Sequence, residues 1–498
     1  MRKKFEQQLS LGIVPIGEIK IREKSRHQLA PLLKALQYLF VTEELNSKVF
    51  TILEEHIMKN KKRTGRPGMS LWEILVLSLV RLNLNIDYDF LLDQANNHYE
   101  LRGIMGVGRT DFKIDKKYHI QTLRDNVGML DEEVLRKIND VIVEASHGVI
   151  KKNEGAEVLE LYTKVDSYVV ETNVHFPTDI NLLWDCGRKV LDVIGHLRGG
   201  ELSLTGWRKY KYHRRKLRNR YRNCAEIHRK KGANYQERLK ESTKAYLSKS
   251  REIESKARQS LSECTQAFIA GQLSLFQVGL VQELQYYLSM LKKHIDLVDR
   301  RILKGEQIPH SEKLFSIFEP HTEWISKGKL QKKVELGHNT AIATDQHHLI
   351  IDFEIMFQTS DAAVGMEMGK RIIDNYGAYC QLRSMSFDRG FYSSLSKEAL
   401  SKDIDKVVMP KKGKRSLAEE EEESQEDYKR LLRAHSAVES NINQLEHNGL
   451  DRCPDKGEKG FRRYIALGVV SYNLHRLGRL LIQAEQASKE EERTRSAA

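Results

Sequence analysis

The segment from Lys164 to Asp179, KVDSYVVETNVHFPTD, alternates in the manner of a β-strand, and one acid interrupts its apolar face. Successive side chains of a strand point to opposite sides, so every second residue shares a face. Asp166 therefore lies on the face formed by Tyr168, Val170, Thr172, Val174 and Phe176. A strand with such a face packs against a core, which commits this part of the chain to a sheet. The carboxylate at the start of the face needs a separate explanation.

Length, charge and cysteine content narrow the class of protein. The 498 residues suffice for several domains with sizeable cores, and the net charge of +13 favours a polyanionic partner, most simply nucleic acid. The five cysteines lack the spacing of a zinc site, which predicts a reduced, cytoplasmic protein without a disulfide framework. We find no signal-peptide pattern and no run of about 18 apolar residues, so we expect no membrane association.

The first 150 residues have the apolar periodicity of helices. Ser70 precedes LWEILVLSLVRLNL, and Glu73 stands three residues later, as in a helix-capping box. A basic linker, KNKKRTGRPGMS, comes before it; its Gly65–Pro67 triplet is either a flexible connection or a minor-groove contact. We predict an all-helical DNA-binding region over residues 1–150, whose helices read the major groove.

Residues 201–309 differ from their surroundings in being basic and helical. A helix capped by Thr178 or Asp179 precedes them. The stretch WRKYKYHRRKLRNRYRNC mixes nine Lys and Arg residues with Trp207, Tyr210, Tyr212 and Tyr221. This mixture suits either phosphate contacts with occasional base stacking or a solvated charged helix. The following amphipathic stretch, AFIAGQLSLFQVGLVQELQYYLSMLKKHIDLVDRRIL, predicts a helical hairpin or a dimerising face.

From residue 313 onward the pattern predicts a second part of the sheet with flanking helices. Expected strands are LFSIF, KKVELGHNTAIAT, HLIIDFEIMF, LRSMSFD and IDKVVMP, with a turn at DQHH whose His347 and His348 we expect to be exposed. We interpret the acidic run Glu419–Glu423 as the solvated first turn of one long helix, EDYKRLLRAHSAVESNINQLEHNGL. A further apolar helix and a charged tail, residues 485–498, follow.

Three acids occupy positions that a purely structural sequence would leave apolar. Asp166 begins a buried face, Asp388 ends the strand SMSFD, and Glu439 lies beside the apolar stripe of the long helix. An isolated buried carboxylate costs several kcal/mol unless it is paired, protonated or bound to a cation. Each acid alone has a salt bridge as an alternative explanation. Together, two strand aspartates and a helix glutamate supply the oxygen ligands that Mg²⁺ or Mn²⁺ prefers, and two such ions support in-line phosphoryl displacement.

Two other acids have simpler interpretations. Asp361 is a candidate cap of the helix SDAAVGMEMGKRIIDNY, with Ser360 as the rival cap. Glu171 lies on the opposite face from Asp166, so we expect it behind the three acids or at the surface.

At these residues the chain resembles bacterial insertion-sequence transposases of the DDE class. The resemblance is carried by five blocks in order: GRPGMSLWEILVLSLVRLNLNIDYDFLLDQANNHYELRGIMG, VDSYVVETNVHFPTDINLLWDCGRKVL with Asp166, HTEWISKGKLQKKVELGHNTAIAT, SFDRGFYS with Asp388, and HSAVESNINQLEHNGLDRCPDKGEKGFRRYIALGVVSYNLHRLG with Glu439. It implies an α/β fold: an RNase H-like catalytic core, that is, a mixed sheet flanked by helices, over residues 160–200 and 310–484. The all-helical N-terminal domain and the long insertion 201–309 would be attached to this core.

The resemblance also implies an activity. Such an enzyme binds the terminal inverted repeats of its own element on double-stranded DNA, cuts there with Mg²⁺ or Mn²⁺ held by Asp166, Asp388 and Glu439, and exposes 3′-hydroxyls. It joins these ends to target DNA by direct transesterification, and it works as a homodimer or larger synaptic complex at the bacterial nucleoid. The candidate DNA-contacting residues are Lys327, Lys329, Arg389, Lys411, Lys412, Arg433, Asn443 and Arg452.

One departure from the family pattern leaves the second-strand chemistry open. Relatives that form hairpin intermediates carry a Tyr-Arg-Glu-Lys signature around the third acid. Here the Tyr, Arg and Lys positions hold Leu432, His435 and Glu446. Two alternatives to an active transposase remain: an inactive or co-opted relative that binds element ends as a repressor, and a hydrolytic nuclease with the same core.

Overall fold

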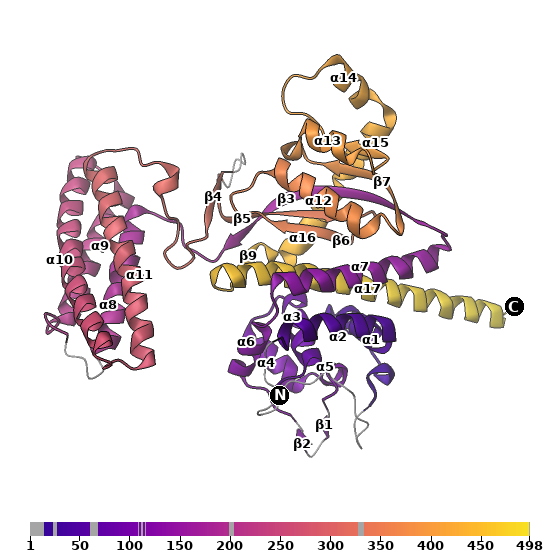
Figure 1. The fold of residues 1–498 in the computed structure, drawn as a ribbon, viewed down its shortest axis with the longest axis horizontal. Coiled ribbons are helices and arrows are strands. Elements are labelled where there is room, and N and C mark those ends of the chain that lie inside the picture. Colours follow the sequence, from indigo (N-terminus) through magenta and orange to yellow (C-terminus); the bar gives the residue numbers. More distant parts are fainter. Residues whose placement is uncertain are drawn as a thin grey trace. The chain divides into compact units, whose positions relative to one another are not determined.

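The computed structural model describes residues 14–22, 27–59, 68–107, 109–110, 113–114, 116–198, 204–326 and 333–497. The chain forms two compact units, and each is built around its own core (Figure 1). Unit 1 comprises Met1–Asn173 and Ile325–Ala498, and unit 2 comprises Val174–Trp324. Of the helices in these described ranges, none combines the length and apolar character required to cross a bilayer.

Unit 1 contains a mixed sheet of the α/β class. Its long central strand, β3 (Leu159–Thr172), pairs antiparallel with β5 on one side and parallel with β7 on the other. β6 continues the sheet antiparallel to β5, and β8 continues it parallel to β7. The strands that accompany β3 in this sheet are β4 (Glu323–Ser326), β5 (Val334–Thr344), β6 (Ile350–Ile355), β7 (Cys380–Phe387), β8 (Lys406–Val408) and β9 (Arg452–Cys453).

Helices cover both faces of this sheet. Tyr168 and Val170 of β3 enter the largest apolar core, together with α7 (Glu132–Glu154) and α17 (Gly457–Ala497). The alternate residue Val165 enters a second core with α12 (Asp361–Tyr376). The two faces of β3, which alternate residue by residue along the sequence, are thus each covered by a different apolar core.

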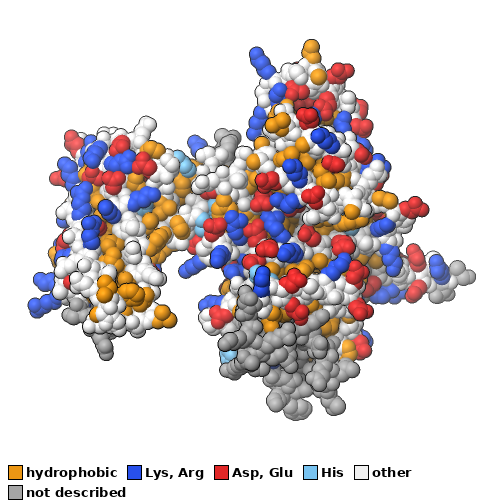
Figure 2. Space-filling model, in the orientation of Figure 1, with side chains coloured by type: hydrophobic (Ala, Val, Ile, Leu, Met, Phe, Trp, Pro, Cys, Tyr) orange, Lys and Arg blue, Asp and Glu red, His pale blue; other side chains and the backbone are white. Residues whose placement is uncertain are grey.

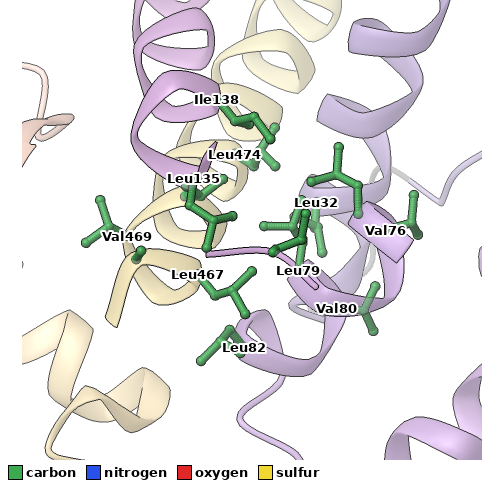
Figure 3. Close-up of a cluster of buried hydrophobic side chains, with 14 of the residues drawn as sticks. Leu32, Val76, Leu79, Val80, Leu82, Leu135, Ile138, Leu467, Val469 and Leu474 are labelled. Carbon is green, nitrogen blue, oxygen red and sulfur yellow. The ribbon is translucent and has the colours of Figure 1, made fainter. Parts of the chain in front are cut away.

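The N-terminal helices share the largest core with α7 and α17. Figure 3 shows Leu32 and Leu79 directed at the cluster that also holds Leu135 and Leu474. Every residue of α3 is buried, and Ser70 and Glu73 form the predicted capping box at its start. The helices are α1 (Leu29–Val41), α2 (Glu43–Ile57), α3 (Leu71–Asn83), α4 (Tyr88–Asn97), α5 (Tyr99–Ile104) and α6 (Ile120–Val127).

One detail of the N-terminal region differs from the expectation. A two-stranded antiparallel ladder, β1 (Arg109–Thr110) with β2 (Lys113–Ile114), interrupts the helices, so the region is not wholly helical. The triplet Gly65–Pro67 lies outside the described residues.

Several expectations for the C-terminal half need correction. LFSIF, residues 314–318, is not a strand but an irregular segment. The long helix predicted from Glu426 is divided at Ser436 into α15 (Glu426–His435) and α16 (Ala437–Leu445). The acidic run forms a helix of its own, α14 (Leu417–Ser424), because Ser416 and Glu419 make a capping box there. Three of its glutamates pair with Lys397, Lys411 and Arg415, so the run is not simply solvated.

In the described part of unit 2, four α-helices form a bundle, which confirms the helical character predicted for residues 205–305. They are α8 (Asp179–Arg198), α9 (Tyr210–Lys230), α10 (Tyr235–Ile269) and α11 (Leu275–Val298). α8 follows directly from the end of β3 but packs with the other three helices around one apolar core, so residues 179–198 belong to the insertion rather than to the sheet unit. The tip of the α10–α11 hairpin exposes Phe268, Ile269, Leu275 and Phe276, an apolar patch visible in Figure 2.

Candidate active site

Asp166 lies on β3 of unit 1, and Asp388 directly follows the end of the neighbouring parallel strand β7. The ladder between β3 and β7 pairs Val165 with Phe387, and the backbone N–H of Asp388 donates to the carbonyl oxygen of Val165 at 3.3 Å. Extending this register by one residue sets Asp166 beside Asp388. The two backbones therefore run side by side up to these two acids.

The strand β3 begins at Leu159 rather than at Lys164, so Asp166 lies in its middle, and its side chain is half-buried. Its Oδ1 accepts a hydrogen bond from the backbone N–H of Ser167 at 2.7 Å. Two residues further on, Tyr168 is buried, and so is Val170. On the other side of Asp166, Lys164 of the same face is also buried, so the half-buried carboxylate lies between two buried side chains.

Glu439 reaches the same region from the first turn of α16, which packs against β3. Its side chain is exposed. His435, the last residue of α15, connects this helical region to β7, the strand that leads to Asp388. The ring Nδ1 of His435 lies 3.0 Å from the Oγ of Ser386 on β7, two residues before Asp388.

The pKa of His435 is lowered, and several nearby groups contribute to this shift or oppose it. Burial lowers this pKa, and Lys164 lowers it further, whereas the carboxylates of Asp388 and Glu439 act in the opposite direction. The second and third acids therefore both lie within electrostatic reach of one ring. The Nε2 of His435 is buried and has no hydrogen-bond partner in the described part of the chain.

The helix α12 brings a fourth acid close to this region. Ser360 is the N-cap of α12, because its side chain accepts from the backbone N–H of Ala363, so Asp361 is left for other contacts. The Oδ1 of Asp361 lies 3.4 Å from the Oγ of Ser167. A Cβ added at Gly390 would stand 2.6 Å from the Oδ2 of Asp361. Asp361 thus contacts the loop that follows Asp388, and the glycine allows this approach.

Sequence reasoning overlooked the polar residues that accompany the acids. Lys164 is buried, and burial lowers its pKa, while Asp345 opposes this shift. A usable signal was present: Lys164 shares the strand parity of Asp166, and Ser386 shares that of Asp388. His435 precedes Glu439 by four residues, a spacing that would set both on one side of an unbroken helix.

The donor set of the three acids fits a hard divalent cation by its chemistry. Asp166, Asp388 and Glu439 offer only carboxylate oxygens, which Mg²⁺ and Mn²⁺ prefer. Across the described ranges, no group of three or more His, Cys, Asp and Glu side chains is spaced to hold a metal ion.

The candidate DNA contacts fall into three groups. Arg389, which directly follows Asp388, is exposed. The first group also includes Lys412, Arg433 of α15 and Asn443 of α16, which are exposed as well. Lys411 and Arg452 are instead ion-paired, Lys411 with Glu419 at 2.9 Å and Arg452 with Glu171 at 2.9 Å. Lys327 and Lys329 lie outside the described residues.

The histidines of the 345–348 turn are not exposed as expected. Both are half-buried. The Nδ1 of His348 lies 2.8 Å from the Oδ1 of Asn441 on α16, which ties this turn to the helix that carries Glu439.

Most of the net positive charge of the protein lies in unit 2. Its 28 Lys and Arg residues against 17 Asp and Glu residues give +11, out of +13 for the whole protein. Along α9, His213, Leu217 and Cys224 are buried, and the basic side chains occupy the exposed faces. The surface of α9 therefore suits a polyanion.

The aromatic residues interleaved with these cations are mostly internal. Trp207 is fully buried, and its Nε1–H donates to the Oγ of Ser260 at 2.7 Å. Tyr221 stacks on Trp184 with ring centroids 5.2 Å apart. Tyr212 alone among the four is exposed. Base stacking along α9 is thus restricted to one ring, and the aromatic pattern mainly reports the bundle core.

Comparison with protein-family models, with curated proteins and with solved structures found no match.

Proposed function

We propose that this chain is a DNA transposase of the DDE class, acting at the ends of its own mobile element. The observation that carries the proposal is the register of the sheet, which brings the backbone of Asp388 beside that of Asp166, while α16, the helix that bears Glu439, packs against the same strand β3. These three acids are 273 residues apart from first to last (439 minus 166).

Two further features support the proposal. The mixed sheet with helices on both faces is compatible with the RNase H-like core that the sequence resemblance implies. The excess of Lys and Arg, concentrated in unit 2, provides the electrostatic attraction that nucleic-acid binding needs.

Within this proposal the three acids would hold Mg²⁺ or Mn²⁺. Such ions, when bound, activate the attacking oxygen and stabilise the leaving oxygen of a phosphodiester. Arg389 and Arg433, exposed near the acids, hold and orient the DNA phosphates. His435 is kept neutral by burial, so it adds no positive charge that would compete with a cation.

The decisive experiment uses duplexes that carry the ends of the element, Mg²⁺ and the full-length protein. We expect nicking at the ends and joining of the exposed 3′-hydroxyls to target DNA. Asp166→Asn, Asp388→Asn and Glu439→Gln should each abolish nicking while DNA affinity stays near that of the wild type. Asp427→Asn and Glu426→Gln, on the exposed start of α15, are matched controls that should remain active.

The products separate this proposal from its alternatives. Binding of element ends without Mg²⁺-dependent nicking by the wild type would indicate a repressor. Nicking without joined strands would indicate a nuclease. Full nicking by a folded Asp388→Asn variant would remove that residue from the site.

A further inference from the structure

A cavity of about 410 Å³ lies entirely within unit 2, where the segment after α11 folds back over the start of α8. Ligand pockets typically have volumes of about 300–1,000 Å³, so the cavity can hold a small organic molecule. Its lining consists of Phe176, Pro177, Thr178, Asp179, Leu182, His228, Arg301, His310, Lys313, Leu314, Phe315 and Trp324. None of these residues is used by the proposed active site.

One wall of the cavity is aromatic. The ring of Trp324 lies 5.5 Å from that of Phe176 and 5.5 Å from that of Phe315, measured between centroids. His310 extends this cluster, with its ring 5.2 Å from Phe315. The ring of Phe176 is 58% exposed, so part of the aromatic surface is open to a ligand. Such walls bind flat aromatic groups through their ring faces.

The polar part of the lining favours an anion. Arg301 donates to the carboxylate of Asp179 at 2.8 Å, which neutralises the one acid of the cavity. A guanidinium has five N–H groups, so Arg301 retains donors beyond this pair. Lys313 adds a second cation, and with neutral histidines the lining has a net charge of +1.

An aromatic wall beside an anion site matches the two halves of a nucleotide. We propose that this cavity binds a nucleotide, with the base against Trp324, Phe315 and Phe176 and the phosphate at Arg301 and Lys313. An apolar ligand would leave the two cations unused, and an acidic peptide would leave the aromatic wall unused. His228 belongs to α9, so the cavity adjoins the polybasic helix that suits a nucleic-acid backbone.

A free mononucleotide and an unpaired nucleotide within DNA share this chemistry, and two probes distinguish them. The first is deoxyadenosine monophosphate, whose binding is followed by isothermal titration calorimetry. The second is a duplex with one 2-aminopurine opposite an abasic site, compared with the fully paired duplex. We expect quenching of 2-aminopurine in the unpaired duplex, because stacking on an aromatic ring quenches this base.

Two variants test the cavity itself. Trp324→Leu should weaken binding of the responding probe about tenfold, since base–aromatic stacking contributes about 1–3 kcal/mol per base. Lys313→Gln should weaken it and lower its salt dependence by roughly one phosphate contact. Phe276→Leu and Lys304→Gln are matched controls in unit 2 that do not line the cavity, and they should bind as the wild type does.

The outcomes decide the proposal without reference to cleavage. Preference for the unpaired duplex identifies a DNA nucleotide as the ligand, and saturable binding of the monophosphate identifies a free one. If the wild type binds neither probe, or if folded Trp324→Leu and Lys313→Gln proteins bind as tightly as the wild type, the cavity is not a nucleotide site. Lys313 is only half-buried, so its variant keeps the test valid if Trp324→Leu misfolds. A negative result here would not affect the proposed role of the three acids, because none of them contributes to either measurement.

Discussion

His435 stands four residues before Glu439, and its ring joins β7 to the helix that carries the third acid. Its Nδ1 contacts Ser386 at 3.0 Å, and its Nε2 is buried without a hydrogen-bond partner in the residues that the structure describes. An unsatisfied buried nitrogen costs free energy, so a structural role alone does not favour histidine here. We interpret His435 as a residue that positions the helix against the acids.

This interpretation predicts a loss of activity that is separable from stability. His435→Ala should reduce single-turnover cleavage about 10–100-fold, the usual effect of removing a group that orients metal-binding side chains. DNA affinity should not change, because the ring is largely buried. His435→Asn retains a hydrogen-bonding group toward Ser386 and should recover part of the rate. A folded alanine variant that cleaves at the wild-type rate would show that the ring has no positioning role.

At the scale of elements, a buried ion pair joins α3 to the segment that leads into α17. The Nη2 of Arg81 lies 2.6 Å from the Oδ1 of Asp455, and the two side chains are 4% and 8% exposed. Arg463 of α17 also contacts Asp455, at 3.1 Å. One carboxylate thus compensates two cations between elements that are remote in sequence.

Removing this carboxylate should destabilise unit 1 strongly. Asp455→Ala leaves two guanidinium groups without their counter-charge, and breaking a buried pair typically costs about 3–5 kcal/mol. Chemical denaturation followed by circular dichroism measures the change. Asp427→Ala, which removes an exposed acid 3.3 Å from Arg430, should cost less than about 1 kcal/mol. Equal losses in the two variants would contradict the assignment of Asp455 to the packing of α3.

A second acid, on α7, should make the stability depend on pH. Burial raises the pKa of Asp140 to about 7 from 3.8, with a further contribution from the charge of Asp352, while Arg136 and Arg371 oppose the shift. A raised pKa means that the folded state holds the proton more tightly. The contribution of Asp140 to stability is therefore greatest below about pH 4 and is lost as the pH rises to 7.

Asp140→Asn should remove this dependence. At about 1.4 kcal/mol per pKa unit, the difference between variant and wild type should grow by at most about 4 kcal/mol between pH 4 and pH 7, in favour of the variant. Unfolding free energies measured across this range give the difference directly. A constant difference would show that Asp140 titrates normally in the folded protein.

The sequence predicted elements well where one physical signal dominated, and less well where several competed. The alternation in β3 and the capping box at Ser70 were both correct, because each is a local pattern with a local cause. LFSIF has strand-like residues but finds no strand to pair with, and the acidic run contains its own cap at Ser416. The register that brings Asp166 beside Asp388 depends on strand pairing across more than 200 residues, which no local pattern specifies.

At the scale of the whole molecule, the charge distribution predicts which surface binds DNA. With +11 of the +13 charges in unit 2, the exposed side of α9 should contribute most of the phosphate contacts. Arg215, Arg218 and Arg222 follow helical spacing on this exposed side. Each phosphate contact contributes about 0.9 to the slope of log K against log salt concentration.

Changing these three arginines to glutamine together should lower that slope by up to about 3 and weaken binding most at low salt. The matched control changes Lys151, Lys152 and Lys402 of unit 1, which are also exposed, and so alters the net charge by the same amount. Fluorescence anisotropy over a series of salt concentrations measures both slopes. If affinity depended only on net charge, the two triple variants would lose the same slope; a loss confined to the α9 variant means that the DNA backbone lies along this helix.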